Sequence, residues 1–447
     1  MQRLLAILFV LSLCLPAKAD DWPRWFGPNN DDSWTEDGLV EKFPEGGPKI
    51  VWRQPVQPGY AGPSVVGDRI YLMDFERRQR REGENKSKVF GTERVLCLDA
   101  TTGAIVWQHS YATGYKVSYP EGPRTTPTVD GDRVYALGTM GHLMCLNAAT
   151  GNVIWSKNLP LIYECTTPIW GYAIHPIVDG DKLICAVGGR DSALVALDKH
   201  DGSEIWSSLT VKEIGYAPPV FVHEGKNRQL VFWHDLAIVG VNPETGSKLW
   251  RVEFPIGKEP NPSQPATPIA TPLVIDGRKV LVSSFFDGSI LLDVAAEPPA
   301  AKTVWVSDAD DKKHEDDLNA LMTTPVAQGD HFYGVAGETG ELRCLSLDDY
   351  KLAWRSQGLV SKKKALFGTA FLVRNKDRYF IWTDQGELVL AKLSPKEYTE
   401  IDRAKILDPT FGARGRKVTW SHPAFSNGRM YVRNFKELVC VDLRADQ

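Results

Sequence analysis

The sequence predicts an all-β fold, an eight-bladed β-propeller of four-stranded antiparallel blades whose last blade is closed by an N-terminal strand. Three observations support this prediction. A unit of four short strands recurs along the 447 residues, most copies end in the same turn-and-tryptophan signature, and the chain opens with the strand that its final unit lacks. Because one small sheet cannot cover its own faces, repeats of this kind pack against one another.

The repeating unit is clearest at residues 122–159. Asp130-Gly131-Asp132 separates its first two strands, because Asp and Gly accept the backbone angles of a tight turn. The second strand alternates apolar and polar residues, as a strand with two different faces does. A second turn ends at Gly151 and leads to the strand that contains Trp155. The four expected strands are residues 125–129, 133–137, 142–146 and 153–155.

Copies of the unit are marked at both ends. The ending D/N-x-x-T-G-x-x-x-W, or a degenerate form of it, places a tryptophan at Trp107, Trp155, Trp206, Trp250 and Trp354. Each unit begins with a small or polar residue followed by proline, and Phe371 replaces the proline once. These starts, spaced by roughly 45 to 65 residues, define eight units. The prolines are Pro63, Pro127, Pro176, Pro219, Pro272, Pro325 and Pro423.

The two ends of the chain are expected to complete one blade. Residues 49–56 resemble the fourth strand of a unit, with Trp52 in the signature position, but no unit precedes them. The final unit has three strands, at residues 419–425, 429–433 and 437–443, and then the chain stops. Pairing the first segment with the last unit closes the ring and removes the open sheet edges.

Residues 1–19 are predicted to be a secretion signal, cleaved near Ala19. Arg3 supplies the positive charge, an apolar run follows, and Ala17-Lys18-Ala19 is a small-x-small cleavage site. The apolar run is too short for a permanent membrane span, and no other segment is long and apolar enough for one. Leu13 is bulkier than the residue expected before a lipidated Cys14, so ordinary cleavage is favoured. The predicted location is the periplasm or outside the cell.

The chain is thus divided into the signal at residues 1–19, an irregular N-terminal segment at 20–47 and the propeller at 48–447. The net charge is −4, and −6 without Arg3 and Lys18, which argues against a nucleic-acid partner. A monomer is expected. Four cysteines share one third-strand position, a small buried apolar slot rather than a disulfide framework: Cys97, Cys145, Cys344 and Cys440.

Two insertions are rich in charge. Residues 76–88 read ERRQRREGENKSK and have no apolar face, so a solvated loop is favoured and a contact for an acidic partner is the alternative. Residues 307–317 are acidic, but they lack the ligand order of a standard calcium loop. No metal site is predicted from either segment.

The signature resembles the repeat of pyrroloquinoline-quinone (PQQ) enzyme-like propellers, and the match covers residues 61–443. The openings WPRWFGP at 22–28 and FPEGGPK at 43–49 are similar to those of secreted planctomycete-type PQQ-binding-like, or BamB-like, proteins. The resemblance implies that the signature tryptophan packs over a peptide of the neighbouring blade. These structural docking residues would be Trp52, Trp107, Trp155, Trp206, Trp250, Trp305 and Trp354.

The resemblance implies two functions. One is a binding or protein-scaffolding module of the cell envelope, with a protein partner or a small-molecule or carbohydrate ligand. The alternative is a quinoprotein oxidoreductase of alcohols or sugars that holds PQQ with Ca²⁺. Such enzymes are characterised by an adjacent cysteine pair, a Glu, Asn and Asp set and a haem-attachment motif. The sequence has no adjacent cysteine pair, no evident set of that kind and no haem-attachment motif. The scaffold is therefore favoured, and PQQ with Ca²⁺ stays the cofactor of the alternative.

Candidate ligand-binding residues are expected along the axis of the ring, which the first strand of each blade lines. The position just before each blade's proline holds His175 and His422, and aromatic residues lie close to both in sequence. A simpler role for the two histidines is to hydrogen-bond backbone groups along the channel. No catalytic residue can be assigned. The hypothesis of an axial pocket rests on Arg124, Trp170, His175, Trp420 and His422.

Overall fold

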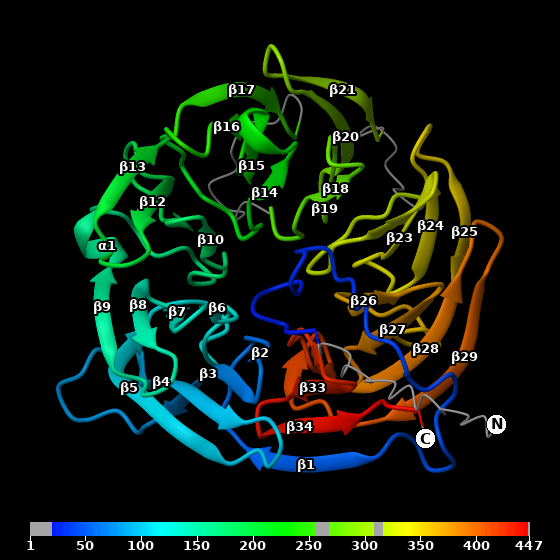
Figure 1. Cartoon of the computed structure of the whole chain (residues 1–447), viewed down its shortest axis with the longest axis horizontal. Coiled ribbons are helices and arrows are strands. Elements are labelled where there is room, and N and C mark those ends of the chain that lie inside the picture. The colour runs from blue at the N-terminus through cyan, green and yellow to red at the C-terminus, as the bar shows by residue number, and fades with distance from the viewer. Residues whose placement is uncertain (1–19, 256–267, 308–315, 446–447) are drawn as a thin grey trace, which may run out of the picture.

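The computed structural model describes residues 20–255, 268–307 and 316–445. Eight four-stranded antiparallel sheets surround a central axis, as Figure 1 shows, so the predicted propeller is confirmed. Helical structure in the described residues is confined to α1 (Leu159–Ile162) and a 3-10 turn (Gly225–Asn227). No described helix has the length and hydropathy that crossing a membrane would require. The predicted secretion signal and most of the acidic insertion lie outside the described residues.

The first four blades follow the order of the chain. Blade 1 contains β2 (Ser64–Val66), β3 (Arg69–Arg77), β4 (Val89–Asp99) and β5 (Ile105–Tyr115). Blade 2 contains β6 (Thr128–Asp130), β7 (Arg133–Leu137), β8 (His142–Asn147) and β9 (Val153–Asn158). Blade 3 contains β10 (Ile177–Asp179), β11 (Lys182–Ala186), β12 (Leu194–Asp198) and β13 (Glu204–Ser208). Blade 4 contains β14 (Val220–Val222), β15 (Gln229–His234), β16 (Ala237–Val241) and β17 (Lys248–Glu253).

The next three blades repeat this pattern, and the eighth takes its outer strand from the N-terminal side. Blade 5 contains β18 (Leu273–Ile275), β19 (Lys279–Ser284), β20 (Gly288–Ala295) and β21 (Ala300–Val306). Blade 6 contains β22 (Val326–Gln328), β23 (His331–Val335), β24 (Leu342–Ser346) and β25 (Leu352–Ser356). Blade 7 contains β26 (Ala370–Asn375), β27 (Arg378–Thr383), β28 (Glu387–Leu393) and β29 (Tyr398–Lys405). Blade 8 contains β32 (Ala424–Ser426), β33 (Arg429–Arg433), β34 (Glu437–Asp442) and β1 (Ile50–Pro55).

The repeated turn before the fourth strand is held by its own side chains. In blade 1, Asp99 Oδ1 accepts hydrogen bonds from the backbone N–H groups of Thr101 and Thr102 at 3.0 and 2.8 Å. Gly103 follows with φ +75°, a conformation that glycine adopts without steric cost. The same arrangement recurs around Asn147 and Asn242. The Asp or Asn, the Thr and the Gly of the signature therefore form a capped turn.

The signature tryptophans join neighbouring blades. Six of them donate the indole N–H to a backbone carbonyl of the next blade, at 2.8–3.2 Å. Trp250 differs, because its indole donates to Gln229 Oε1 at 2.7 Å and the Gln229 amide donates to Ala295 O of blade 5. The other six are Trp52, Trp107, Trp155, Trp206, Trp305 and Trp354.

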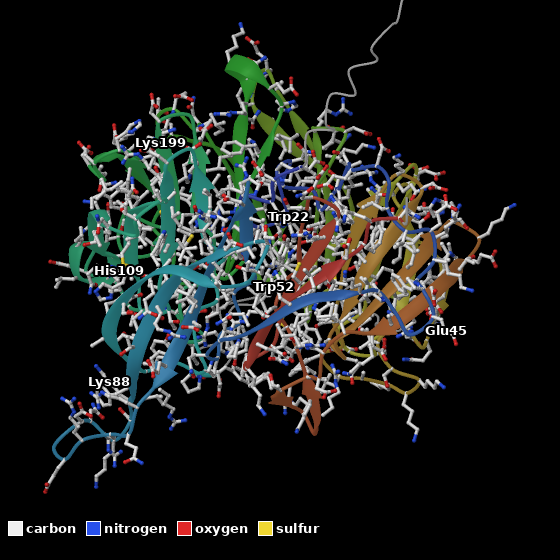
Figure 2. All side chains as sticks on the ribbon, turned by 60° about the horizontal axis from the view of Figure 1, so that its bottom comes forward. Trp22, Glu45, Trp52, Lys88, His109 and Lys199 are labelled. Atoms are coloured by element: carbon white, nitrogen blue, oxygen red, sulfur yellow. The ribbon has the colours of Figure 1, made fainter. Side chains whose placement is uncertain are left out.

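Blade 1 is the longest because its middle strands extend into a projecting hairpin. Residues 78–88 form the tip, which Figure 2 shows pointing away from the body near the labelled Lys88. The stacked rings of Phe75 and Tyr115, 4.2 Å apart between centroids, stiffen its base. A shorter hairpin, β30 (Phe411–Ala413) with β31 (Arg416–Val418), lies in the segment expected to be a simple link between blades 7 and 8.

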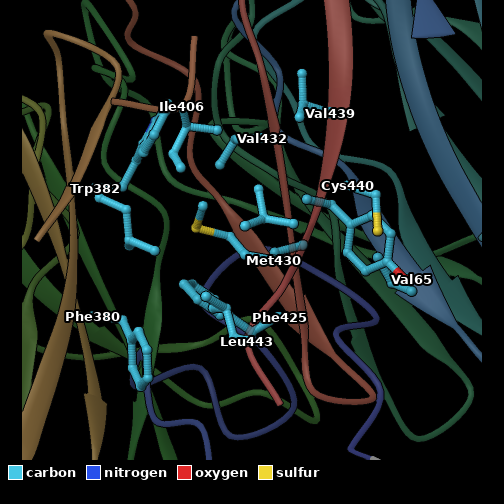
Figure 3. Close-up of a cluster of buried hydrophobic side chains, with 14 of the residues drawn as sticks. Val65, Phe380, Trp382, Ile406, Phe425, Met430, Val432, Val439, Cys440 and Leu443 are labelled. Atoms are coloured by element: carbon cyan, nitrogen blue, oxygen red, sulfur yellow. The ribbon is translucent and has the colours of Figure 1, made fainter. Parts of the chain in front are cut away.

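The ring closes as predicted. β1 pairs antiparallel with β34, with Arg53 opposite Val439, so strands from the two ends of the chain share blade 8. The segment before β1 then lies along the junction of blades 7 and 8. There Trp34 packs between Phe380 and Phe425, at centroid distances of 5.3 and 4.8 Å. Figure 3 shows the buried cluster around this junction, with Phe380 and Trp382 of blade 7 facing Phe425, Met430 and Leu443 of blade 8.

The segment before β1 also takes the place of a docking tryptophan. In blade 7 the strand position of the signature tryptophan holds Asp402, opposite Leu390. The Asp402 carboxylate accepts a hydrogen bond from the backbone N–H of Phe43 at 2.9 Å. Val40 N in turn donates to Leu443 O of blade 8 at 2.9 Å. These bonds join the blades where the repeat provides no indole.

The shared cysteine position is buried in all four blades, as expected. In blade 1, Cys97 lies between Tyr71 on the second strand and Trp107 on the fourth. The equivalent cysteines of blades 2, 6 and 8 have the same tyrosine and tryptophan neighbours. None of these cysteines forms a disulfide among the described residues. Burial raises the pKa of the Cys97 thiol to about 11, so it behaves as a small apolar side chain.

Candidate functional site

The N-terminal segment crosses the centre of the ring. Figure 1 shows it as the dark blue loop inside the circle of blades. Residues 22–32 are held there by the Trp22–Val65 backbone bridge to blade 1 and by Asp32 O, which accepts from Arg374 N of blade 7. We refer to residues 22–32 as the plug. The plug divides the axis into two cavities, of about 240 and about 320 Å³, and Trp25 lines both.

The smaller cavity is predominantly aromatic, and we call it the aromatic cavity. In seven of the eight blades, the residue three positions before the proline that begins the unit lines this cavity. In blade 7 that position is Gly368, and the neighbouring Phe367 lines the cavity in its place. The lining residues are Trp25, Tyr60, Tyr119, Arg124, Trp170, Ala173, His175, Tyr216, Pro218, Ile269, Leu321, Met322, Phe367, Phe371 and Trp420.

Four of the five predicted axial residues therefore line one cavity. Trp170 packs against Tyr216 at 4.9 Å between ring centroids, and Trp420 against Phe411 at 5.1 Å. The indole nitrogen of Trp420 is buried and has no hydrogen-bond partner among the described residues. That N–H is an available donor at the cavity wall.

Arg124 is the cationic residue in this lining. Its guanidinium donates to the backbone carbonyls of Gly122, Ser118 and Tyr119 and lies over the Tyr60 ring, 5.0 Å from its centroid. Burial lowers the pKa of Arg124, opposed mainly by Tyr60. The guanidinium thus stabilises the loop at residues 118–124 and has little capacity left for an anion.

His175 is a neutral wall residue. Its ring stacks on Trp25 at 4.4 Å with 15° between planes, and its Nδ1 accepts a hydrogen bond from Thr126 N at 2.8 Å. Burial, followed by the nearby His422, lowers the pKa of His175 to about 3. A neutral ring with Nδ1 as acceptor satisfies the buried Thr126 amide, which is the role expected for an accommodated histidine.

His422 does not line the aromatic cavity and instead fastens the plug. Its Nε2 lies 2.8 Å from Asp32 Oδ1, with both side chains buried. Its ring contacts Trp25 at 4.6 Å between centroids. Burial raises the pKa of Asp32, and the interaction with His422 opposes that rise. The hypothesis that both histidines share one ligand pocket therefore has only His175 in the cavity wall.

The second cavity opens on the other side of the plug and is more polar. The plug contributes Arg24, Asn29 and Asp31 to it, and the inner strands contribute a set of prolines and threonines. Arg24 Nη2 donates to Pro28 O at 3.2 Å, which leaves the buried Nε of Arg24 without a described partner. This cavity is walled on one side by the N-terminal segment itself.

Comparison with known proteins identifies the family. The family model described as outer membrane protein assembly factor BamB matches residues 91–356. The chain belongs to the BamB family. No curated protein matches this BamB-family chain in sequence.

Solved structures share the fold at low identity. BamB from Moraxella catarrhalis is similar with a TM-score of 0.56 and 15% identity, over 89% of this chain and 98% of that one. The quinohemoprotein alcohol dehydrogenase from Comamonas testosteroni is similar with a TM-score of 0.57 and 14% identity, over 96% and 81%. The computationally designed Ika8 protein is similar with a TM-score of 0.52 and 12% identity, over 88% of this chain and 100% of that one. These likenesses concern the fold.

The described lining of the aromatic cavity does not have the donor set that PQQ with Ca²⁺ needs. PQQ carries several carboxylates, whereas the aromatic cavity offers one cation, Arg124, which is already committed to carbonyls. A hard cation takes oxygen ligands, and no Asp or Glu stands among the described residues that line this cavity. Across the described ranges, no three His, Cys, Asp or Glu side chains converge as a metal site would require. The described residues that line the aromatic cavity therefore fit neither the cofactor nor its ion.

The position just before each proline, which the sequence singled out, lines the second cavity at His175, Pro218, Thr271 and Thr324. The aromatic cavity is lined mainly three residues earlier, where Arg124 and Trp420 lie. Comparing that earlier position between units would have revealed the aromatic set, because Tyr60, Tyr216 and Trp420 share it with Arg124. Trp25 could not be found in this way, since the plug belongs to no repeat.

Proposed function

We propose that this chain is an exported binding and scaffolding module of the cell envelope, and that the aromatic cavity is its binding site. The observation that carries the proposal is the cavity wall itself, in which aromatic rings from many blades surround one committed guanidinium. Such a wall binds an apolar or aromatic group of a partner through burial and ring contacts. The family description, an outer membrane protein assembly factor, supports a protein partner in the envelope.

The residues that we propose to contact the partner are Trp170, Tyr216 and Trp420, with the unpaired Trp420 N–H as a donor to a partner carbonyl. Arg124 positions the loop that presents Tyr119 at the rim, where its ring is exposed. The quinoprotein oxidoreductase is the weaker proposal, because the described lining of the aromatic cavity has no carboxylate for Ca²⁺, and its cation, Arg124, is hydrogen-bonded to backbone carbonyls.

Site-specific photo-cross-linking in cells tests the proposal. A photoreactive residue at Tyr119 is expected to capture a discrete envelope protein, and the same residue at Val106, exposed on an outer strand, is expected not to capture it. The capture at Tyr119 should be lost in a Trp170→Ala background. Capture that is equal at both positions, or unaffected by Trp170→Ala, would contradict the proposal.

A second measurement addresses the oxidoreductase directly. Purified protein titrated with PQQ and Ca²⁺ is expected to show no saturable uptake and no dye-linked oxidation of alcohols or sugars. Uptake at one PQQ per chain, together with dye reduction, would instead establish the enzyme.

A further inference from the structure

Residues 76–88, which we call the basic hairpin, form a surface that the proposed function does not use. Six Arg and Lys residues accompany three Glu there, a net charge of +3 in a chain of net charge −4. Glu84 is occupied by Arg78, whose two terminal nitrogens donate to its carboxylate at 2.9 and 2.6 Å. The structure shows no ion pair, to any described residue, for the side chains of the other five cations: Arg77, Arg80, Arg81, Lys86 and Lys88.

The basic hairpin is built to project. β3 and β4 have 9 and 11 residues, whereas the corresponding strands of blade 2 have 5 and 6. Ladder pairs continue outward to Arg77 opposite Gly91, and Arg78 lies over the Phe90 ring at 5.1 Å. Figure 2 shows the tip standing clear of the rest of the molecule. The cations are therefore held away from the body on a paired support.

The basic hairpin stands on the face where the aromatic cavity opens. Val89 pairs with Tyr115, so the base of the hairpin lies beside the end of β5. From there the chain runs through Lys116, an exposed cation, and Tyr119 to the cavity wall at Arg124.

Exposed apolar side chains accompany the cations on this face. Tyr119 is 41% exposed, and the following connection, after β9, exposes Leu161 at 76%, Ile162 at 49% and Ile169 at 51%. Ser118 N donates to Ile169 O at 2.8 Å, which joins the two connections. We call Leu161, Ile162 and Ile169 the apolar edge. Neighbouring exposed cations and apolar residues on one face mark an interaction surface.

We propose that the basic hairpin and the apolar edge dock this face of the propeller on an anionic lipid surface, with the cations on lipid phosphates and the apolar edge at the headgroup boundary. Residues 76–88 contain no aromatic or aliphatic side chain, the kind of residue that anchors a stable protein interface. Lipid phosphates need no such anchor, because each Lys or Arg near an anionic leaflet adds to the attraction. Guanidinium groups also bind phosphate bidentately.

Vesicle co-sedimentation of the purified protein tests this inference. We expect binding to vesicles that contain phosphatidylglycerol, at least about ten-fold weaker binding to phosphatidylcholine alone, and loss of binding when salt rises from about 0.1 M to about 1 M, where the Debye length falls to about 3 Å. Absence of binding to the anionic vesicles, or equal binding to both kinds, would overturn it.

Matched variants locate the contact. Arg80→Glu with Arg81→Glu should reduce binding to anionic vesicles at least about ten-fold. Lys248→Glu with Lys302→Glu changes the net charge equally on exposed outer strands of blades 4 and 5 and should leave binding near the native level. Leu161→Ser should weaken binding to anionic vesicles more than Ile105→Ser does. Ile105 is also exposed, but it lies on the outer strand of blade 1. Equal effects of the two charge variants would overturn the assignment to the hairpin.

Discussion

At the scale of single residues, each docking tryptophan contributes both ring packing and one hydrogen bond between blades. Trp206 is 7% exposed, its indole N–H donates to Pro243 O of blade 4 at 3.1 Å, and its ring covers Gly246. Trp206→Ala removes the buried ring, its hydrogen bond and its cover over Gly246, and should lower the free energy of unfolding by about 3–5 kcal/mol. The adjacent Ile205→Ala, at an exposed position, should cost much less. Urea unfolding of both variants measures the difference, and equal losses would refute the docking role.

His175 makes stability depend on pH in a defined direction. Its pKa is about 3 in the folded protein, against about 6.5 in an unfolded chain. As pH falls from about 6.5 toward about 3, the unfolded state binds a proton that the native state does not, so the residue lowers stability by up to about 1.4 kcal/mol per pH unit. Above that window it contributes nothing to the pH dependence.

His175→Asn should flatten this part of the stability profile while keeping an acceptor for Thr126 N. Asp32 acts in the opposite direction, because its raised pKa favours the folded state as pH falls. The difference between native and variant urea midpoints at about pH 7 and about pH 4.5 isolates His175. Parallel profiles would show that His175 takes up its proton over the same pH range in the native and unfolded states.

Contacts within one turn could be predicted from the sequence, whereas the hydrogen-bond partner of a docking tryptophan could not. Turn residues such as Asp99 and Gly103 act on their immediate neighbours, so a local pattern identified them. Trp250 retains its signature position, but blade 5 has Pro298 and Pro299 in place of a glycine turn, and its indole donates to Gln229 instead. The partner of an indole depends on the blade opposite, which the local motif does not contain.

At the scale of elements, the segment before β1 acts as a wedge between blades 7 and 8. Trp34 is 1% exposed between Phe380 and Phe425, and its indole nitrogen has no described partner, so its contribution is packing. Trp34→Ala should cost about 3–5 kcal/mol in urea unfolding, whereas Glu41→Ala, at an exposed position in the same segment, should cost little. A small loss for Trp34→Ala would mean that the junction holds without the wedge.

This element was predicted to be irregular, and in the structure it forms isolated bridges at Trp22, Ser33 and Leu39. Its burial could not be predicted, because Trp22, Trp25 and Trp34 pack against surfaces that exist only after all eight blades are arranged. The blades themselves were predictable, since each turn and strand is specified within its own unit. The plug explains why the axial pocket was only partly predicted, as it provides Trp25 to the wall and draws His422 away toward Asp32.

At the scale of the whole molecule, closure through the two ends covers the edge of β34 with β1, so blade 8 has four strands like the other blades. Chains that begin at residue 20, 48 or 57 separate the contributions of the wedge and of β1. The chain from 48 keeps β1 and should be less stable but monomeric. The chain from 57 exposes the edge of β34, whose unpaired backbone groups should drive self-association.

Light scattering after size-exclusion chromatography measures the oligomeric state of the three chains, and thermal unfolding measures their stability. A synthetic peptide of residues 48–56 should restore a monomer to the chain from 57 by pairing with β34, because the native register places Arg53 opposite Val439 and Trp52 opposite Cys440. A peptide with Trp52 replaced by Ala should do so less well, since it lacks the indole that donates to Ala100 O of blade 1 at 3.1 Å. A monomeric chain from 57 with unchanged thermal unfolding would show that the ring does not require its outer strand.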